Sequence, residues 1–270
     1  MSSAEGAATF RASAEMYDRH VGRYVPRLSR ELVHVAGVRA GQRVLDVGCG
    51  PGGLTAAIAE VAGAHNVAAV DPSEPFVEAC RRRVPGADVR VGEAESLPFA
   101  DDTFDAALSQ LVVNFMTDAE AGVDEMRRVT RPGGMVASAV WDYADEMTML
   151  RTFWDAALAL DPDAPDEGRT MRYCSRGELE ALWEQIGLAD VRSGELVVDA
   201  AYEDFDDYWA PLVSGVGPSG AYGAALDPER RAALREECRR RLGSPEGAFR
   251  LAARAWYVVG HVPDPGLTRV

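Results

Sequence analysis

The feature that most constrains this chain is a glycine-rich turn in the segment Arg43–Leu54, RVLDVGCGPGGL. The apolar, β-branched run before the glycines predicts a buried strand. The apolar residues after them recur with the period of one helix face. Glycine has no Cβ, so its backbone can approach a ligand closely, and the start of a helix offers unpaired N–H groups. The segment therefore predicts a site for a nucleotide-like ligand.

Strands and helices alternate after this turn. Further strands are expected at 66–70, 88–91, 104–108, 135–140, 191–200 and 251–259, and a capping box at Ser175 and Glu178 predicts a helix. Strands that alternate with helices imply right-handed βαβ units. We therefore expect an α/β fold, Rossmann-like and doubly wound, with a mostly parallel seven-stranded sheet and helical cap insertions.

The expected division of the chain follows from where this alternation is interrupted. A helical N-terminal segment that closes the ligand site would take residues 1–40, with one helix over 12–25. The Rossmann-like core would take 41–141, 175–202 and 249–270, and the cap insertions, which would bind the second substrate, would take 142–174 and 203–248. A second glycine pattern at 215–220 has no credible strand before it and is predicted to be a loop.

Composition excludes several classes of function. The net charge of −15 disfavours a nucleic-acid partner, which would need a basic stripe. All 28 basic residues are arginine, which excludes P-loop, Schiff-base, pyridoxal-phosphate and kinase chemistry, because each needs a lysine. With four histidines and no HExxH or GxSxG motif, neither a metal site nor a serine triad is expected.

Location and partners are predicted from the same composition. The four cysteines lack CxxC spacing and are expected to be reduced thiols in a cytoplasmic protein. No signal peptide is visible, and no apolar stretch approaches the ~20 residues of a membrane span. We expect a small molecule as partner, and the sequence does not indicate an oligomeric state.

Two residues of the turn bear on which ligand it binds. Asp46 stands two residues before the first glycine, where a pyrophosphate would meet a carboxylate. Pro51 removes one N–H donor from an anion cradle. A ligand with an adenosine, no phosphate and cationic groups fits better, and S-adenosylmethionine is such a ligand.

At this point the sequence resembles the class I S-adenosylmethionine-dependent methyltransferases (methyltransferase type 11-like), and is similar to the branch of ubiquinone and menaquinone biosynthesis. The resemblance spans about residues 43–140. It includes five ordered motifs: VLDVGCGPGG, AVDPS, GEAESLPFADDTFD, the fourth strand and RPGGM. It implies methyl transfer from S-adenosylmethionine by in-line displacement to a small, apolar or aromatic metabolite.

The resemblance also implies a set of cofactor-binding residues. Asp71 would accept the ribose hydroxyls, Phe76 would pack on the adenine, and Glu93 stands where the family usually has aspartate. The glycine turn and the end of the fourth strand would hold the methionine part. The full set is Tyr17, Tyr24, Asp46, Gly48, Cys49, Gly50, Asp71, Pro72, Ser73, Phe76, Glu93, Ala94, Ser109 and Gln110.

Acceptor binding and proton transfer are less well indicated. The expected acceptor residues are Asn114, Phe115, Trp141, Tyr143 and Trp154, and His20 is the candidate catalytic base. Two other functions stay open. One is a nicotinamide-dependent oxidoreductase that uses the same glycine turn, and the other is a cofactor-binding protein without catalysis.

Overall fold

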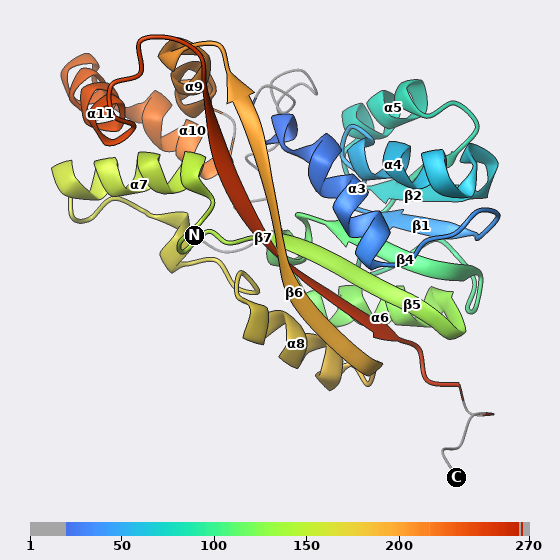
Figure 1. The fold of residues 1–270 in the computed structure, drawn as a ribbon. Helices are drawn as coiled ribbons and strands as arrows, with labels where there is room; N and C mark the ends of the chain where they lie inside the picture. Colours follow the sequence, from blue (N-terminus) through green and yellow to red (C-terminus); the bar gives the residue numbers. More distant parts are fainter. Residues whose placement is uncertain (1–19, 216, 265, 267–270) are drawn as a thin grey trace. The chain divides into compact units, whose positions relative to one another are not determined.

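The computed structural model describes residues 20–215, 217–264 and 266 (Figure 1). The chain divides into two compact units. The core unit comprises Val25–Val140, Arg172–Leu196 and the chain from Trp256 onward. The helical unit comprises the chain up to Tyr24, Trp141–Met171 and Val197–Ala255. Each unit is described by itself, and the predicted functional division into core and cap stays a prediction.

One sheet of seven strands runs in the order β3-β2-β1-β4-β5-β7-β6. Its strands are β1 (Val44–Val47), β2 (Val67–Asp71), β3 (Asp88–Val91), β4 (Phe104–Gln110), β5 (Thr130–Trp141), β6 (Ala189–Tyr202) and β7 (Phe249–His261). β1 to β5 pair in parallel. β7 is antiparallel to β5, because Gly133 N–H donates to Val262 O and Val262 N–H donates to Gly134 O, both at 2.9 Å. The predicted fold class is confirmed.

The helices of the core unit cover both faces of its part of the sheet (Figure 1). α3 (Val25–Val35), α4 (Gly53–Ala62) and α5 (Glu74–Arg83) lie on one face, and α6 (Ala119–Val129) and α8 (Arg176–Gln185) lie on the other. Short 3-10 turns occur at η2 (Ala64–Asn66) and η3 (Val113–Phe115). The predicted N-cap begins α8, since Ser175 Oγ accepts from Glu178 N–H, and the Ser175 hydroxyl also donates to the Glu178 carboxylate.

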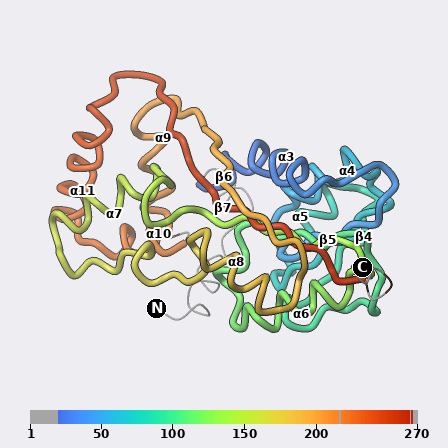
Figure 2. The backbone as a smooth tube through the Cα atoms, turned by 60° about the horizontal axis from the view of Figure 1, so that its bottom comes forward, coloured from blue at the N-terminus to red at the C-terminus, as the bar shows by residue number. Residues whose placement is uncertain are grey.

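The helical unit is built around aromatic side chains. Its elements are η1 (Val21–Arg23), α7 (Thr148–Leu160), η4 (Glu167–Arg169), α9 (Phe205–Trp209), η5 (Ala210–Val213), α10 (Gly217–Ala225) and α11 (Pro228–Arg241). α7 packs against α10 and α11 (Figure 2). The Phe153 ring meets the ring of Trp154 edge-on, with centroids 5.2 Å apart, and lies 6.4 Å from that of Trp209. These buried rings form the apolar interior of the unit.

Three predictions about local structure were wrong. The segment predicted as a loop at 215–220 contains the start of α10, because the helix packs on η5 and α7 and tertiary contact outweighs its glycine content. β5 begins at Thr130, so residues 131–134 belong to the strand. Within the described part of 12–25, a 3-10 turn precedes α3, which begins at Val25.

None of the described helices has both the length and the apolar character that a membrane crossing requires.

Candidate cofactor site

The glycine turn joins the end of β1 to the start of α4, beside the end of β4. The order β2-β1-β4 makes this edge the point where the strand order reverses, the place where α/β sheets bind ligands. Gly48 has φ +74°, and a Cβ there would lie 2.4 Å from Val112 Cγ2. At Gly50, with φ +51°, a Cβ would meet nothing within 4 Å. Gly48 is therefore required for packing, while Gly50 faces the open side of the turn.

Asp71, at the end of β2, holds the turn in place with its carboxylate. Its Oδ2 accepts from Gly50 N–H at 2.8 Å, and its Oδ1 accepts from Ser73 N–H at 2.9 Å. Burial raises the pKa of Asp71, the N–H groups of Ser73 and Gly50 lower it, and the charge of Glu93 raises it. Each oxygen of a carboxylate can accept a second hydrogen bond. Asp71 can thus order the turn and still accept from a ligand.

Asp46 is fully buried in β1, and its Oδ2 accepts from Thr55 Oγ1–H at 2.6 Å. Its Oδ1 has no hydrogen-bond partner among the described residues. Burial raises the pKa of Asp46 to about 7; the Thr55 hydroxyl and N–H oppose the shift, and the charge of Asp71 adds to it. The turn therefore has two buried carboxylates beside it, which favours a ligand with positive charge.

The other predicted cofactor residues of the core unit follow the ends of neighbouring strands. Gly92 N–H donates to Asp71 O at 3.2 Å, which places Glu93 (exposed) and Ala94 (buried) next to the end of β2. Ser109 pairs in register with Val47 at the end of β1. The structure brings these residues to one edge of the sheet, with Gln110 buried beside them. Phe76 is buried in α5, and Pro72 and Ser73 lead into that helix.

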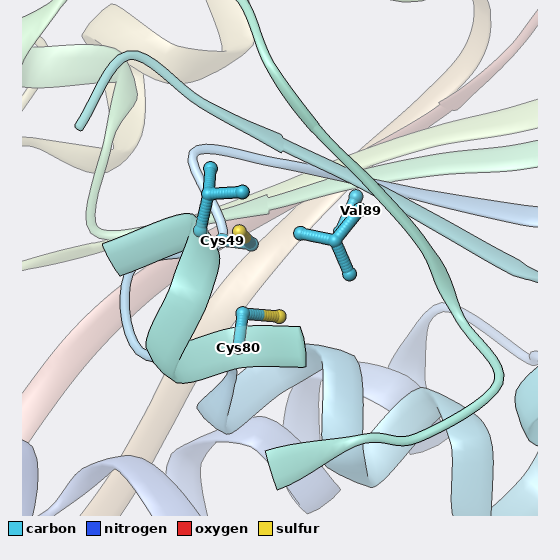
Figure 3. Close-up of a cluster of buried hydrophobic side chains, with 5 residues drawn as sticks. Cys49, Cys80 and Val89 are labelled. Atoms are coloured by element: carbon cyan, nitrogen blue, oxygen red, sulfur yellow. The ribbon is translucent and has the colours of Figure 1, made fainter. Parts of the chain in front are cut away.

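Cys49 lies on the inner side of the turn. It belongs to a buried apolar cluster with Ala69, Val77, Cys80 and Val89, from β2, α5 and β3. Figure 3 shows Cys49, Cys80 and Val89 in this cluster. A hydrogen bond with the Cys80 thiol, together with burial, raises the pKa of Cys49, so it stays a neutral thiol and fills space. Sequence reasoning missed Thr55 and Cys80. The signal was available, because each interrupts an otherwise apolar helix face with a polar or sulfur-containing side chain.

The predicted acceptor residues are divided between the two units. Asn114 and Phe115 form part of η3 in the core unit, directly after the end of β4. Trp141, Tyr143 and Trp154 are buried in the helical unit. Asn114 is buried and Phe115 is half-buried, and the binding of an acceptor by these five residues stays a prediction.

Of the predicted N-terminal residues, His20 and Tyr24 fall in the helical unit. Tyr24 is fully buried, its hydroxyl 3.0 Å from that of Tyr202 and its ring edge-on to Trp141. Tyr17 lies outside the described residues. His20 is buried, and burial together with the charge of Arg23 lowers its pKa to about 4. A base of that strength is poorly matched to proton transfer near pH 7.

Glu167 is a buried acid of the helical unit that sequence reasoning missed. It is almost fully buried in the helical unit, and its Oε1 accepts from Trp154 Nε1–H at 2.8 Å. Burial raises its pKa to about 7; the bond from Trp154 and the charge of Arg151 oppose the shift, while the charge of Asp166 adds to it. The native state therefore binds this proton more tightly than the unfolded chain.

This shift predicts a pH dependence of stability. Since the pKa of Glu167 is raised from 4.5 to about 7, its contribution to stability is full below pH 4.5 and is lost as the pH rises through about 7. Glu167→Gln keeps an acceptor for Trp154 and removes the titration. We expect the variant to gain free energy of unfolding relative to the parent as the pH rises from about 5 to about 8. Urea unfolding across this range measures the difference, and a constant difference would contradict the assignment.

Comparison with known proteins identifies this arrangement. The sequence profile of a family described as a methyltransferase domain matches residues 45–138. An uncharacterised protein from Mycobacterium bovis is 30% identical over 77% of this chain and 73% of its own length. A malonyl-[acyl-carrier protein] O-methyltransferase from Erwinia billingiae is 36% identical over 59% of this chain. The chain belongs to the S-adenosylmethionine-dependent methyltransferases. The resemblance inferred from its motifs is confirmed.

Two further methyltransferases bear on the branch and the fold. A demethylmenaquinone methyltransferase from Clavibacter sepedonicus is 44% identical over 36% of this chain and 40% of its own length. The phosphoethanolamine N-methyltransferase 2 of Haemonchus contortus was solved with S-adenosylmethionine, and it is 16% identical to the present chain with a TM-score of 0.54. The match covers 88% of the present chain and 53% of the Haemonchus chain. The present chain spans 61% of the Erwinia relative, less than two thirds of its length.

The residues of the turn fit the family's cofactor. Its ammonium and sulfonium groups are cations, and Asp46 and Asp71 are buried acids on the two strands that flank the turn. The buried Asp46 Oδ1 is an acceptor that a ligand donor can satisfy, and the backbone at Gly50 is open to close approach. Pro51 supplies no N–H, as expected of a site that binds no phosphate.

Proposed function

We propose that this methyltransferase transfers a methyl group from S-adenosylmethionine to a small apolar or aromatic molecule. The observation that carries the proposal is the pair of buried carboxylates, Asp46 and Asp71, beside the glycine turn at the switch point of the sheet. Asp71 lies where a ribose would be bound, and Asp46 lies near the end of the turn assigned to the methionine part. The family matches support the same cofactor.

The proposed mechanism relies on binding and orientation. The cofactor, when bound, supplies an activated methyl group on a positive sulfur. The backbone of Gly48 and Gly50 and the carboxylate of Asp71 orient it, and exclusion of water from the site prevents loss of the methyl group to hydrolysis. The end of β4 lies beside the turn in the sheet, because Ser109 pairs in register with Val47. Gln110 is proposed to help bind the cofactor there, and Asn114, in η3, is proposed to face the acceptor.

The proposed acceptor is apolar because aromatic residues dominate the predicted acceptor set. Among them, Phe115 is half-buried in η3, whereas Trp141 and Trp154 are buried in the helical unit. His20 remains the candidate base from the sequence, but its pKa of about 4 disfavours that role. We therefore propose an acceptor atom that is nucleophilic near neutral pH without deprotonation by His20.

Equilibrium binding separates this function from the nicotinamide alternative. We expect the protein to bind S-adenosylhomocysteine and not NAD(H). The Asp46 carboxylate would repel a pyrophosphate, and Pro51 has no N–H to donate to it. Isothermal titration with both ligands measures this. Tight binding of NAD(H) with no binding of S-adenosylhomocysteine would overturn the proposal.

A methyl-transfer screen separates catalysis from cofactor binding alone. The protein is incubated with methyl-labelled S-adenosylmethionine and an extract of small apolar metabolites, and the label is followed into new products. We expect labelled product from the parent, and roughly ten- to a hundredfold less from Asp71→Ala at a cofactor concentration below the dissociation constant of the parent. Strong binding of the cofactor with no labelled product from any extract fraction would favour the non-catalytic alternative.

A further inference from the structure

We propose that Thr55 is a positioning residue that holds the Asp46 carboxylate so that its second oxygen receives the ammonium group of S-adenosylmethionine. The inference rests on the function proposed above and assigns a role to a residue outside the family's recognised motifs in this sequence.

The contact between Thr55 and Asp46 links the strand before the glycine turn to the helix after it. Both side chains are fully buried, and the 2.6 Å separation of Thr55 Oγ1 and Asp46 Oδ2 is that of a hydroxyl bonded to a charged oxygen. Tying one oxygen restricts rotation of the carboxylate, so the direction of Oδ1 is also set. Thr55 thereby determines where the remaining acceptor of Asp46 is presented.

Cys80 orients the Thr55 hydroxyl from α5. Its Sγ–H donates to Thr55 Oγ1 at 3.4 Å. A hydroxyl has one proton to donate and lone pairs to accept, so acceptance from Cys80 leaves the Thr55 proton for Asp46. The three side chains form a directed series in which the final acceptor is Asp46. This gives Cys80, which lies in the buried cluster with Cys49 and Val89 (Figure 3), a polar function beside its packing.

The second oxygen of Asp46 needs a donor. Asp46 Oδ1 is buried and has no partner among the described residues, and an unsatisfied buried acceptor is destabilising. Asp46 interacts electrostatically with three titratable groups, Asp71 on β2, Cys49 in the turn and Cys80 on α5. None of the three carries positive charge. On the cofactor, the sulfonium has no hydrogen to donate. The ammonium is therefore the cationic donor that completes the site.

The parent protein provides the first test, through the pH dependence of ligand affinity. Asp46, with its pKa raised to about 7, is ionised above that pH and neutral below it. We expect S-adenosylhomocysteine to bind about tenfold more weakly near pH 6 than near pH 8. Methylthioadenosine, which lacks the amino-acid part, is expected to change by less than about twofold over the same range. A flat profile for S-adenosylhomocysteine, with binding retained, would overturn the inference.

The second test is the pair Thr55→Val and Thr55→Ser. Valine keeps the shape of threonine and removes the hydroxyl, so the pKa of Asp46 should rise further and the midpoint of the affinity profile should move to higher pH. Serine keeps the donor and is expected to restore the parent midpoint. At neutral pH, we expect Thr55→Val to bind S-adenosylhomocysteine roughly tenfold more weakly and methylthioadenosine unchanged.

The two ligands separate positioning from a merely structural role. Equal loss of both ligands in Thr55→Val, or an unmoved midpoint, would show that Thr55 acts through packing and would overturn the inference. Should Thr55→Val fail to fold, Thr55→Ala, which also removes the hydroxyl, is compared with Thr55→Ser in its place. Absence of binding of both ligands to the parent protein would instead contradict the proposed function, so the two failures are distinguishable.

Discussion

An Asp71→Ala variant is expected to lose ~1.5–3 kcal/mol of binding free energy for S-adenosylhomocysteine, the range for hydrogen bonds to a charged group. This corresponds to a dissociation constant roughly ten to a hundred times larger. The reason is twofold. The variant loses the acceptor proposed for the ribose hydroxyls, and it also releases the N–H groups of Gly50 and Ser73, which the carboxylate holds at 2.8 and 2.9 Å. Isothermal titration near pH 8 measures the change.

A matched control comes from a neighbouring strand. Asp88→Ala removes a carboxylate that is exposed at the start of β3 and pairs with Arg90 at 2.6 Å. Because this pair is at the surface, we expect its loss to leave ligand affinity unchanged and to cost about 0–1 kcal/mol of stability. Unchanged affinity in a folded Asp71→Ala variant would remove Asp71 from the cofactor site.

The parts of the site that the sequence predicts are those set by backbone geometry. Gly48 needs a positive φ and the space next to Val112, and glycine satisfies both. Asp71 ends a strand in parallel register with β1, so the position of its carboxylate follows from the sheet. Alternation of strands and helices was enough for the fold class, because right-handed crossovers leave few ways to assemble such a sheet.

The parts that the sequence does not predict depend on side chains distant along the chain. Thr55 and Cys80 lie on different helices, and their contact requires α4 and α5 to pack at a particular separation. The burial of Glu167 with Trp154 depends in the same way on how η4 returns to α7. Residue spacing carries no information on such contacts. α10 was missed for a related reason, since its helix is stabilised by packing and its own residues have low helix propensity.

The second large effect concerns stability. Trp183→Ala is expected to lower the free energy of unfolding by about 3–5 kcal/mol, the range for truncation of a fully buried aromatic side chain. Trp183 lies on α8, is fully buried, and its Nε1–H donates to Val136 O on β5 at 3.0 Å. The ring also touches β7, because a Cβ at Gly260 would lie 2.9 Å from Trp183 Cδ1. Urea unfolding followed by far-UV circular dichroism measures the loss.

Two companion variants separate the contributions of the ring. Trp183→Phe keeps an aromatic ring and removes the N–H, so it should cost less than Trp183→Ala, about 1–3 kcal/mol. Gly260→Ala places a methyl group against Trp183 Cδ1 and the Cβ of Leu188, which would lie 3.0 Å away, and overpacking of this kind costs about 1–3 kcal/mol.

The double variant Trp183→Ala with Gly260→Ala tests whether the contact with β7 is as close as the structure shows. Removal of the indole also removes the atom that the new methyl group would strike, so the methyl can enter part of the space left by the ring. We therefore expect the two losses to be less than additive by about 0.5–3 kcal/mol, the coupling typical of residues in direct contact. Since Leu188 remains, some of the cost of Gly260→Ala should persist. Strict additivity would mean that the ring and the strand are not in contact, and that α8 is held to the sheet by other residues.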